Sequence, residues 1–359
     1  MEKRYLILAI NPGSTSTKIA VFRNSKSVFL KTIRHTSANL EKYERITDQF
    51  HFRKEMILTE LKDSELDVNK ISAVVGRGGL IRPVESGVYE VNDIMVQELR
   101  EARRGEHASN LGGLIAMDIA QSLPDARAFI ADPVVVDEMN DVARLSGHPY
   151  FERRSIFHAL NQKAIARSHA KTLDRDYEDL NLIIAHLGGG ISVGAHKKGK
   201  VIDVNNALDG DGPFSPERTG GLPVGQVASL CYSGDYSYEE VKKMIKGLGG
   251  LVAYLDTNDA YEVELMVRDG NEKAKLVQDA MSYQIGKEIG ALSAVLNGEV
   301  DSIILTGGIA HNPMVVDYVR SMVRFIAPVA IYPGEDEMQA LAENGLRVLK
   351  GEEQVKIYE

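Results

Sequence analysis

The chain has 359 residues, of which 44% are hydrophobic, so it can bury a large core and is long enough for two domains. Its formal net charge of -9 argues against a protein that wraps DNA or RNA, because such proteins use basic patches to replace counterions. No nucleic-acid partner is therefore expected.

Cys231 is the only cysteine, so no intrachain disulfide can form and a reducing compartment is expected. The apolar run that follows residues 1–4 is far shorter than a signal-peptide core. No run approaches the ~18 apolar residues of a membrane span. These features predict a soluble, cytoplasmic protein without a membrane partner.

The first predicted element is a β-hairpin whose apolar strands lie at residues 6–10 and 19–22. Its turn carries four polar residues that could face a phosphate group, namely Asn11, Ser14, Ser16 and Lys18. A turn of Gly and Ser lets N–H and hydroxyl donors approach phosphate oxygens, because no bulky side chain blocks them. The segment is not a P-loop, since the second Gly before the Lys is missing. Taken alone, it could equally be an ordinary polar hairpin turn, with Lys18 as an outward strand residue.

Two acidic residues are candidates for binding Mg²⁺. After a predicted strand at residues 68–75 and two predicted helices, a short strand at 126–131 is closed by Asp132 and Pro133. A carboxylate at a strand end is a frequent Mg²⁺ position, since Mg²⁺ takes one or two carboxylates together with phosphate and water. Glu337 is the weaker candidate, because residues 335–337 are all acidic and could cap the last helix.

A second hairpin, predicted after a helix at residues 155–173, repeats the pattern of the first. Its strands flank a turn that contains Gly188, Gly189 and Gly190. Three consecutive glycines cost backbone entropy, and close approach to a ligand is a reason to keep them. Two such hairpins suggest two related domains that grip a phosphorylated ligand, as in a kinase or ATPase built by duplication.

The remaining elements continue the alternation of strands and helices, which predicts an α/β fold. Helices are expected at residues 238–246, 259–267 and 273–296. The buried strand at 303–305 then breaks at a glycine turn before the next helix. This turn contains Gly307, Gly308 and Ile309, and its geometry suits a nucleotide, the alternative being a tight β–α turn.

Histidines and loop arginines complete the set of candidates. His107, His158 and His186 each lie beside a Gly-rich segment or a helix start, although a lone His is more often structural, and no spacing suggests zinc. Arg77 and Arg218 lie in glycine-flanked loops, where an Arg has little packing purpose and can bind an anion bidentately.

Taken in order, these motifs resemble the acetate and butyrate kinases of the acetokinase family. The set comprises Asn-x-Gly-Ser-x-Ser-x-Lys, Phe157-His158, residues 186–190, Arg218-Thr219-Gly220 and residues 306–309. The resemblance covers essentially the whole chain. It implies the fold of the acetate kinase, sugar kinase and actin superfamily: two ribonuclease-H-like domains around an ATP cleft. The domains are expected at residues 1–178 and 179–336, with a final helix at 337–350 packing on the first domain.

The resemblance also implies roles for individual residues. It places four residues of the first turn at the transferred phosphate and Mg²⁺: Asn11, Ser14, Ser16 and Lys18. It assigns the metal to Asp132 and Glu337, and the phosphoryl group in transfer to His158 and Arg218. Further residues would lie near the phosphates: Arg77, His107, His186, Gly188 and Gly190. The adenosine would be held by Asp259, Gly307, Gly308 and Ile309.

Several segments are similar to butyrate kinases in particular, including residues 132–138 and 203–214. Where acetate kinases carry an Asn in the second turn, this chain has Gly189. Arg77 also lies directly beside Gly78, unlike the corresponding Arg of acetate kinases. We hypothesise that the small Gly76 leaves room for a longer acyl chain.

The implied reaction is reversible, direct in-line transfer of a phosphoryl group from ATP to the carboxylate of butyrate or a similar short-chain or branched acid. An aliphatic acid with a pKa of ~4–5 is already ionised at neutral pH, so no general base is required. The active site must instead align two anions and stabilise charge on the equatorial oxygens. The alternatives are an acetate or propionate kinase, or a non-enzymatic nucleotide-switched protein of the actin type. The family also implies a homo-oligomer.

Overall fold

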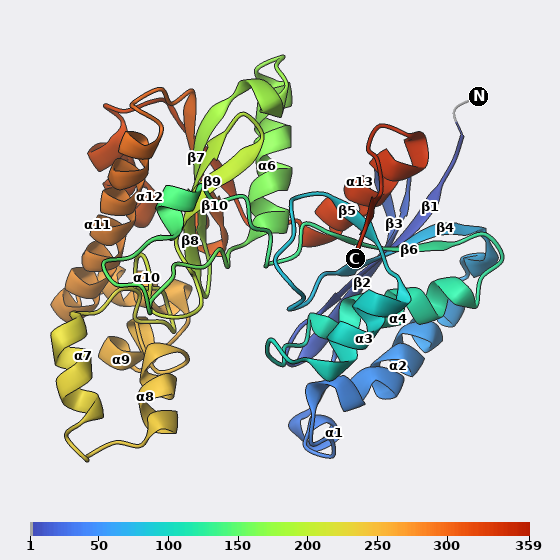
Figure 1. Cartoon of the computed structure of the whole chain (residues 1–359), viewed down its shortest axis with the longest axis horizontal. Helices are drawn as coiled ribbons and strands as arrows, with labels where there is room; N and C mark the ends of the chain where they lie inside the picture. Colours follow the sequence, from blue (N-terminus) through green and yellow to red (C-terminus); the bar gives the residue numbers. More distant parts are fainter. Residues whose placement is uncertain (1–2) are drawn as a thin grey trace. The chain divides into compact units, whose positions relative to one another are not determined.

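The computed structural model describes residues 3–359, which form two compact units (Figure 1). Unit 1 contains the described residues up to Val136 together with Asp336–Glu359, and unit 2 is Asp137–Glu335. The sequence placed this division at residue 178. The structure places residues 137–178 in unit 2, because helix α6 (Ala159–Thr172) packs its buried alanines against Leu182 and Ile184 of that unit.

Unit 1 is built on a seven-stranded sheet with the order β12-β5-β6-β4-β1-β2-β3. Its strands are β1 (Leu6–Pro12), β2 (Ser16–Arg23), β3 (Lys26–Arg34), β4 (Ile71–Arg77), β5 (Val88–Glu90), β6 (Arg127–Ala131) and β12 (Lys356–Ile357). Strands β1 and β2 form the predicted antiparallel hairpin, and β4 pairs with β1 in parallel. The hairpin turn therefore lies at the same end of the sheet as the carboxyl end of β4.

Helices cover both faces of this sheet. They are α1 (Ser37–Leu40), α2 (Phe50–Asp63), α3 (Asp93–Glu101), α4 (Asn110–Gln121) and α13 (Glu337–Lys350). Consecutive residues of β4 face opposite sides, since a strand alternates its side chains. A Cβ added at Gly345 of α13 would lie 2.7 Å from Val75, whereas one added at Gly76 would lie 2.2 Å from the Gly112 carbonyl of α4. Helices α13 and α4 thus cover opposite faces.

Unit 2 is built on a five-stranded sheet with the order β11-β10-β7-β8-β9. Its strands are β7 (Asn181–Leu187), β8 (Ile191–Lys197), β9 (Lys200–Val204), β10 (Ser302–Gly307) and β11 (Val329–Pro333). Its helices are α5 (Asp141–Arg144), α6, α7 (Val224–Cys231), α8 (Tyr238–Ile245), α9 (Leu251–Leu255), α10 (Ala260–Arg268), α11 (Glu272–Val295) and α12 (Pro313–Val323). Every residue of β7 is buried, as its continuous apolar run predicts for a strand covered on both faces.

The two sheets share one topology. In both, an antiparallel three-stranded meander is extended by two parallel strands, in the order β3-β2-β1-β4-β6 in unit 1 and β9-β8-β7-β10-β11 in unit 2. The predicted α/β class and the predicted duplication are therefore confirmed. Among residues 3–359, no helix is long and apolar enough to cross a membrane.

Candidate functional site

The turn of the β1–β2 hairpin in unit 1 is short and closed on itself. The Gly13 N–H donates to the Ser16 carbonyl at 2.7 Å. Ser14 is exposed, and Lys18 is an exposed residue between the buried Thr17 and Ile19. The Ser14 hydroxyl and the Lys18 ammonium are therefore accessible from solvent, which is the property that a phosphate ligand requires.

A buried arginine supports this turn, and the sequence did not predict its role. Arg53 of α2 is 1% exposed and donates from Nη1 to the carbonyl oxygens of Gly13 (2.8 Å) and Ser16 (3.1 Å), and from Nη2 to that of Ser14 (3.1 Å). Its Nε donates to Gln49 Oε1 at 3.0 Å. Burial lowers the pKa of Arg53 to about 10. These bonds turn the carbonyls of the loop toward α2.

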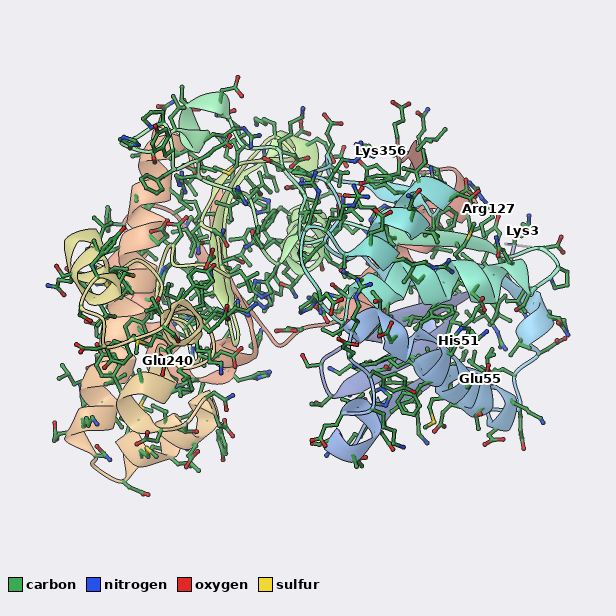
Figure 2. The ribbon with its side chains drawn as sticks, turned by 60° about the horizontal axis from the view of Figure 1, so that its bottom comes forward. Lys3, His51, Glu55, Arg127, Glu240 and Lys356 are labelled. Carbon is green, nitrogen blue, oxygen red and sulfur yellow. The ribbon has the colours of Figure 1, made fainter. Side chains whose placement is uncertain are left out.

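Helix α2 shows why Arg53 was missed. Arg53, Ile57 and Leu61 recur every four residues and are all buried, while His51 and Glu55 lie on its exposed side (Figure 2). An arginine in the apolar stripe of a helix is the signal that could have identified it.

Asn11, Arg77 and Glu337 form one cluster in unit 1. Arg77 Nη1 lies 3.0 Å from Glu337 Oε1 and 3.3 Å from Asn11 Oδ1, and the Asn11 amide donates to Glu337 Oε2. Asn11 is the second-to-last residue of β1, Arg77 is the last residue of β4, and Glu337 begins α13. Three segments far apart in the sequence thus meet at one end of the sheet, and their charges are paired.

Asp132 and His107 have local hydrogen-bond partners. Asp132 is 1% exposed and has a positive φ of 37°, and its Oδ1 accepts from Ser86 Oγ (2.6 Å) and the Gly87 N–H (2.9 Å). His107 is exposed, and its Nδ1 lies 2.8 Å from Ser109 Oγ. The contacts of Asp132 fix the loop before β5.

Unit 2 brings two of the predicted histidines together. The rings of His158 and His186 stack with centroids 3.9 Å apart and an interplanar angle of 16°. His158 Nδ1 lies 2.9 Å from Ser192 Oγ, and His186 Nδ1 lies 2.9 Å from Asn161 Oδ1. His186 Nε2 is buried without a hydrogen-bond partner and lies 3.1 Å from the carboxylate of Glu335. The Glu335 carboxylate is thus the charged group next to this nitrogen.

The glycines of the second turn make room for these groups. A Cβ at Gly188 would lie 3.2 Å from His186 Nε2, and one at Gly190 would lie 1.8 Å from Arg218 Nη1. Arg218 donates to the Ala207 carbonyl at 2.6 Å, whereas its buried Nε has no hydrogen-bond partner. Burial lowers the pKa of Arg218, and Glu217 opposes this shift. Gly190 is therefore required for the position of the guanidinium group.

The predicted adenosine residues separate into two groups. Gly307 has a positive φ of 92°, and a Cβ there would lie 2.4 Å from the Leu187 carbonyl at the end of β7. A Cβ at Gly308 would meet no atom within 4 Å, so this glycine faces open space. Asp259 instead caps α10, since its side chain accepts from the backbone N–H groups of Tyr261 and Glu262.

The hypothesis that Gly76 widens an acyl pocket is wrong. The Cβ position of Gly76 is filled by the backbone of Gly112, and a Cβ at Gly112 would in turn lie 2.2 Å from the Arg77 carbonyl. These two glycines permit β4 and α4 to pack backbone against backbone. No space for a substrate exists on that side of Gly76.

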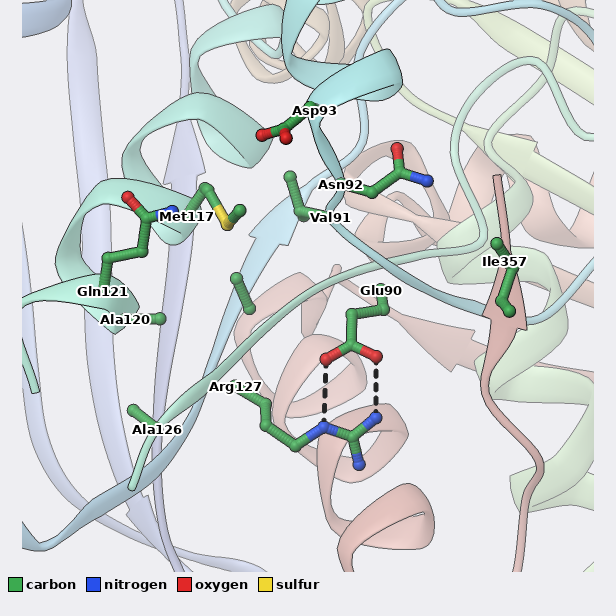
Figure 3. A pocket seen from close by; sticks show the side chains of 11 residues that line it. Glu90, Val91, Asn92, Asp93, Met117, Ala120, Gln121, Ala126, Arg127 and Ile357 are labelled. Carbon is green, nitrogen blue, oxygen red and sulfur yellow. Dashed lines mark hydrogen bonds and ion pairs between the residues drawn. The ribbon is translucent and has the colours of Figure 1, made fainter. Parts of the chain in front are cut away.

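A cavity of about 450 Å³ lies elsewhere in unit 1, beside β5, β6 and the terminal β12. Across it, Glu90 and Arg127 form a two-point ion pair with distances of 3.1 and 2.9 Å (Figure 3). None of the predicted site residues lines this cavity. The charges of Glu90 and Arg127 therefore neutralise each other at this cavity.

Comparison with known proteins identifies the family. The Acetokinase family model matches residues 145–356, more than half of the chain. Butyrate kinase 2 of Clostridium acetobutylicum is 57% identical over 355 residues, which cover 99% of each chain. The chain belongs to the acetokinase family.

Solved structures share the fold of this acetokinase-family chain. Porphyromonas gingivalis acetate kinase superposes with a TM-score of 0.78 at 21% identity, covering 96% of this chain and all of its own. A propionate kinase of Francisella tularensis superposes with a TM-score of 0.73 at 20% identity, covering 95% and 98% of the two chains. The two-unit architecture with duplicated sheets is thus the acetokinase fold.

Proposed function

We propose that this acetokinase-family protein is a butyrate kinase. It catalyses reversible transfer of the γ-phosphoryl group of ATP to the carboxylate of butyrate, or of a similar short-chain or branched acid, giving butyryl phosphate and ADP. The observation that carries the proposal is the 57% identity to Butyrate kinase 2 over 99% of both chains. An identity of this size over nearly the whole length of both chains favours the same type of reaction.

In the proposed reaction, a carboxylate oxygen of the acid attacks the γ-phosphorus while the bond to the β,γ-bridging oxygen breaks, and ADP leaves with that oxygen. Nucleophile and leaving group are both anionic, so the enzyme must supply positive charge and N–H donors. Arg218 fits this task, because its Nε is buried and unpaired. His158, whose ring stacks on that of His186, supplies a ring nitrogen as a second donor to the phosphoryl group.

In unit 1 we propose that Asn11, Ser14, Ser16 and Lys18 contact the phosphates, with Arg77 and His107 nearby. In unit 2 we assign the same role to His186, Gly188 and Gly190. Gly307, Gly308 and Ile309 would hold the adenosine, because Gly308 faces open space. Asp259 would contribute indirectly, since its carboxylate is engaged in capping α10.

We propose Mg²⁺ as the metal, held by Glu337 with Asp132 as the second carboxylate. Within residues 3–359, no group of three or more His, Cys, Asp and Glu side chains could enclose a metal ion. Mg²⁺ takes one or two protein carboxylates and completes its shell with phosphate and water. The oxygens of Asn11 and Glu337 are the kind of donors it prefers. Bound Mg²⁺ would neutralise charge on the phosphates.

We further propose a cytoplasmic homo-oligomer. Helix α7 is largely apolar, yet none of its residues is buried. Its first residue, Val224, is 81% exposed, and Tyr232, directly after its end, is 92% exposed. An exposed apolar surface of this kind is typical of a subunit interface. Light scattering on the purified protein measures the oligomeric state directly, and a monomer would contradict this part of the proposal.

Trapping the acyl phosphate with hydroxylamine tests the reaction. Hydroxamate formation is measured with ATP and Mg²⁺ across acetate, propionate, butyrate, isobutyrate and valerate. The highest kcat/KM is expected with butyrate or isobutyrate, and activity is expected to disappear with excess EDTA. A maximum at acetate would retain the reaction and overturn the proposed substrate. No hydroxamate with any acid would overturn the proposed function.

A further inference from the structure

We propose that a chain of buried hydrogen bonds, ending at Ser192, fixes His158 as the neutral tautomer that carries its proton on Nε2. Four side chains of unit 2 form this relay: Tyr177, His196, Gln162 and Ser192. Each is at most 3% exposed. Only the use of that proton rests on the proposed function, since the tautomer itself follows from the contacts.

The relay is continuous from Tyr177 to His158. The Tyr177 hydroxyl lies 2.7 Å from His196 Nδ1, and His196 Nε2 lies 2.9 Å from Gln162 Oε1. Gln162 Nε2 lies 2.9 Å from Ser192 Oγ, which lies 2.9 Å from His158 Nδ1. All four distances are those of ordinary hydrogen bonds.

A backbone carbonyl determines the direction of these bonds. Gln162 Nε2 also lies 3.0 Å from the carbonyl oxygen of Ser192. A carbonyl can only accept, so this atom of Gln162 must be the amide nitrogen, which donates. The other amide atom, Oε1, then accepts a proton from His196 Nε2. The orientation of Gln162 is thus set by the main chain of β8.

The same reasoning determines the direction in which the Ser192 hydroxyl donates its proton. Its hydroxyl oxygen accepts from the Gln162 amide, and the backbone N–H of His158 also points to it at 3.4 Å. With its oxygen serving as an acceptor, the hydroxyl directs its own proton to His158 Nδ1. A neutral imidazole that accepts at Nδ1 carries its proton on Nε2.

The far end of the relay prevents the opposite direction. His196 is fully buried, and burial together with the nearby Lys163 and Arg167 holds its pKa well below the usual range. A neutral His196 that donates from Nε2 must accept at Nδ1, where the Tyr177 hydroxyl supplies a proton. Gly194 leaves the space for this arrangement, because a Cβ there would lie 2.7 Å from Gln162 Oε1.

The relay gives His158 a defined chemical property. Its Nε2–H is a fixed donor that can bind a phosphoryl oxygen without gaining or losing a proton during transfer. Ser192, Gln162 and His196 act through His158, so they are positioning residues. The sequence signals for this role are Gly194 and the His196 side chain inside a buried strand.

The first test uses the wild-type, ligand-free, full-length protein labelled with ¹⁵N-histidine. Long-range ¹H–¹⁵N correlation distinguishes the two neutral tautomers and the imidazolium ion, and comparison with His158→Gln assigns the signal. At neutral pH, the Nε2–H tautomer is expected for His158. An Nδ1–H tautomer or an imidazolium ion would overturn the proposal. This readout is independent of kinase activity, so failure of the proposed function would be seen separately.

The second test reverses the direction of the relay. Gln162→Glu replaces the donating amide by a carboxylate, which can only accept. The Ser192 hydroxyl then donates its proton to this carboxylate instead of to His158. His158 must therefore carry its proton on Nδ1 and donate it to Ser192, so the fraction of His158 in the Nε2–H tautomer falls. A fall in kcat of about 10²-fold is expected, with little change in the KM for ATP. Gln278→Glu is the matched control, since Gln278 is a buried glutamine of unit 2 whose Oε1 only accepts, from Asn312 at 2.9 Å.

In the control variant, the His158 tautomer and kcat are expected to match those of the wild type. The proposal fails if Gln162→Glu retains the Nε2–H tautomer, or if Gln278→Glu changes the tautomer to the same extent. Proteolytic stability of each variant is measured in parallel. If Gln162→Glu does not fold, the wild-type spectrum still decides the proposal.

Discussion

The turns of the β1–β2 and β7–β8 hairpins occupy equivalent places in two copies of one topology, yet they use arginine differently. In unit 1, Arg53 is buried and donates to three carbonyl oxygens of the turn. In unit 2, Arg218 Nη1 occupies the space in which a Cβ of residue 190 would lie, and the buried Nε of Arg218 has no hydrogen-bond partner. The first arginine holds the conformation of a turn, whereas the second is the one that we propose to bind the phosphoryl group.

The two turns thus share their place in the topology but differ in the arginine that each one uses. A turn whose carbonyls are all bound from behind presents its N–H and hydroxyl groups outward. In the turn of three glycines a hydroxyl replaces the arginine, since Ser215 Oγ donates to the Gly189 carbonyl at 2.7 Å, and the missing Cβ of Gly190 leaves room for the Arg218 side chain. The comparison predicts that removing the Arg53 side chain mainly lowers the stability of the protein, and that removing the Arg218 side chain mainly lowers its activity.

The largest effect is expected from Arg218→Ala. Loss of a donor that stabilises charge developing in the transition state typically lowers kcat by about 10²–10³-fold. The midpoint of thermal unfolding should change little, because Arg218 makes a single hydrogen bond, to Ala207, through its side chain. Hydroxamate assays and thermal unfolding measure both effects. Normal turnover in this variant would remove Arg218 from the proposed mechanism.

The opposite pattern is expected from Arg53→Met. The substitution removes the side-chain donors of the Gly13 and Ser14 carbonyl oxygens and one of the two donors of the Ser16 carbonyl, so the free energy of unfolding should fall by about 3 kcal/mol. Urea denaturation measures the loss. Arg103→Met is the control, because the Arg103 side chain is 77% exposed and its ion pair contributes little. Equal stability of the two variants would show that Arg53 does not support the turn.

These two arginines also show the extent of what the sequence could predict. The apolar runs and glycine turns at residues 6–22 and 182–195 predicted both hairpins and the duplication, because strand and turn signals are local. Arg218 was identified by its glycine-rich loop. Arg53 was missed because its role depends on α2 packing behind a turn about 40 residues away. Gly76 was misinterpreted for the same reason, since its partner Gly112 belongs to a different element.

Gly190→Ala sharpens the comparison within the second turn. A Cβ at this position would lie 1.8 Å from Arg218 Nη1, so the guanidinium must move, and kcat is expected to fall by about 30-fold, part of the effect of losing the donor. Gly189→Ala is the matched control, since its nearest neighbour, Glu217 Oε1, would lie 3.9 Å away. A similar loss of kcat in both variants would indicate a general effect on the turn.

The smallest effect concerns His35, which supports the first turn through a bond of 2.9 Å between its Nε2 and Thr17 Oγ1. Burial, and then the charge of Arg53, lower the pKa of His35 from 6.5 to about 4. Between these two values the unfolded chain binds more protons than the folded protein. The free energy of unfolding therefore falls as the pH drops from about 6.5 to about 4, by roughly 2 kcal/mol from this group.

Replacing His35 by a residue that does not titrate isolates this contribution. His35→Gln is expected to flatten the dependence of the unfolding free energy on pH in this window, as measured by urea denaturation at several pH values. His51→Gln, on the exposed side of α2 (Figure 2), is the control and should retain the wild-type slope. An unchanged slope in His35→Gln would mean that the pKa of His35 is the same in the folded protein as in the unfolded chain. Burial and the charge of Arg53 would then not act on His35, and Thr17 and His35 would not form a buried support behind the first turn.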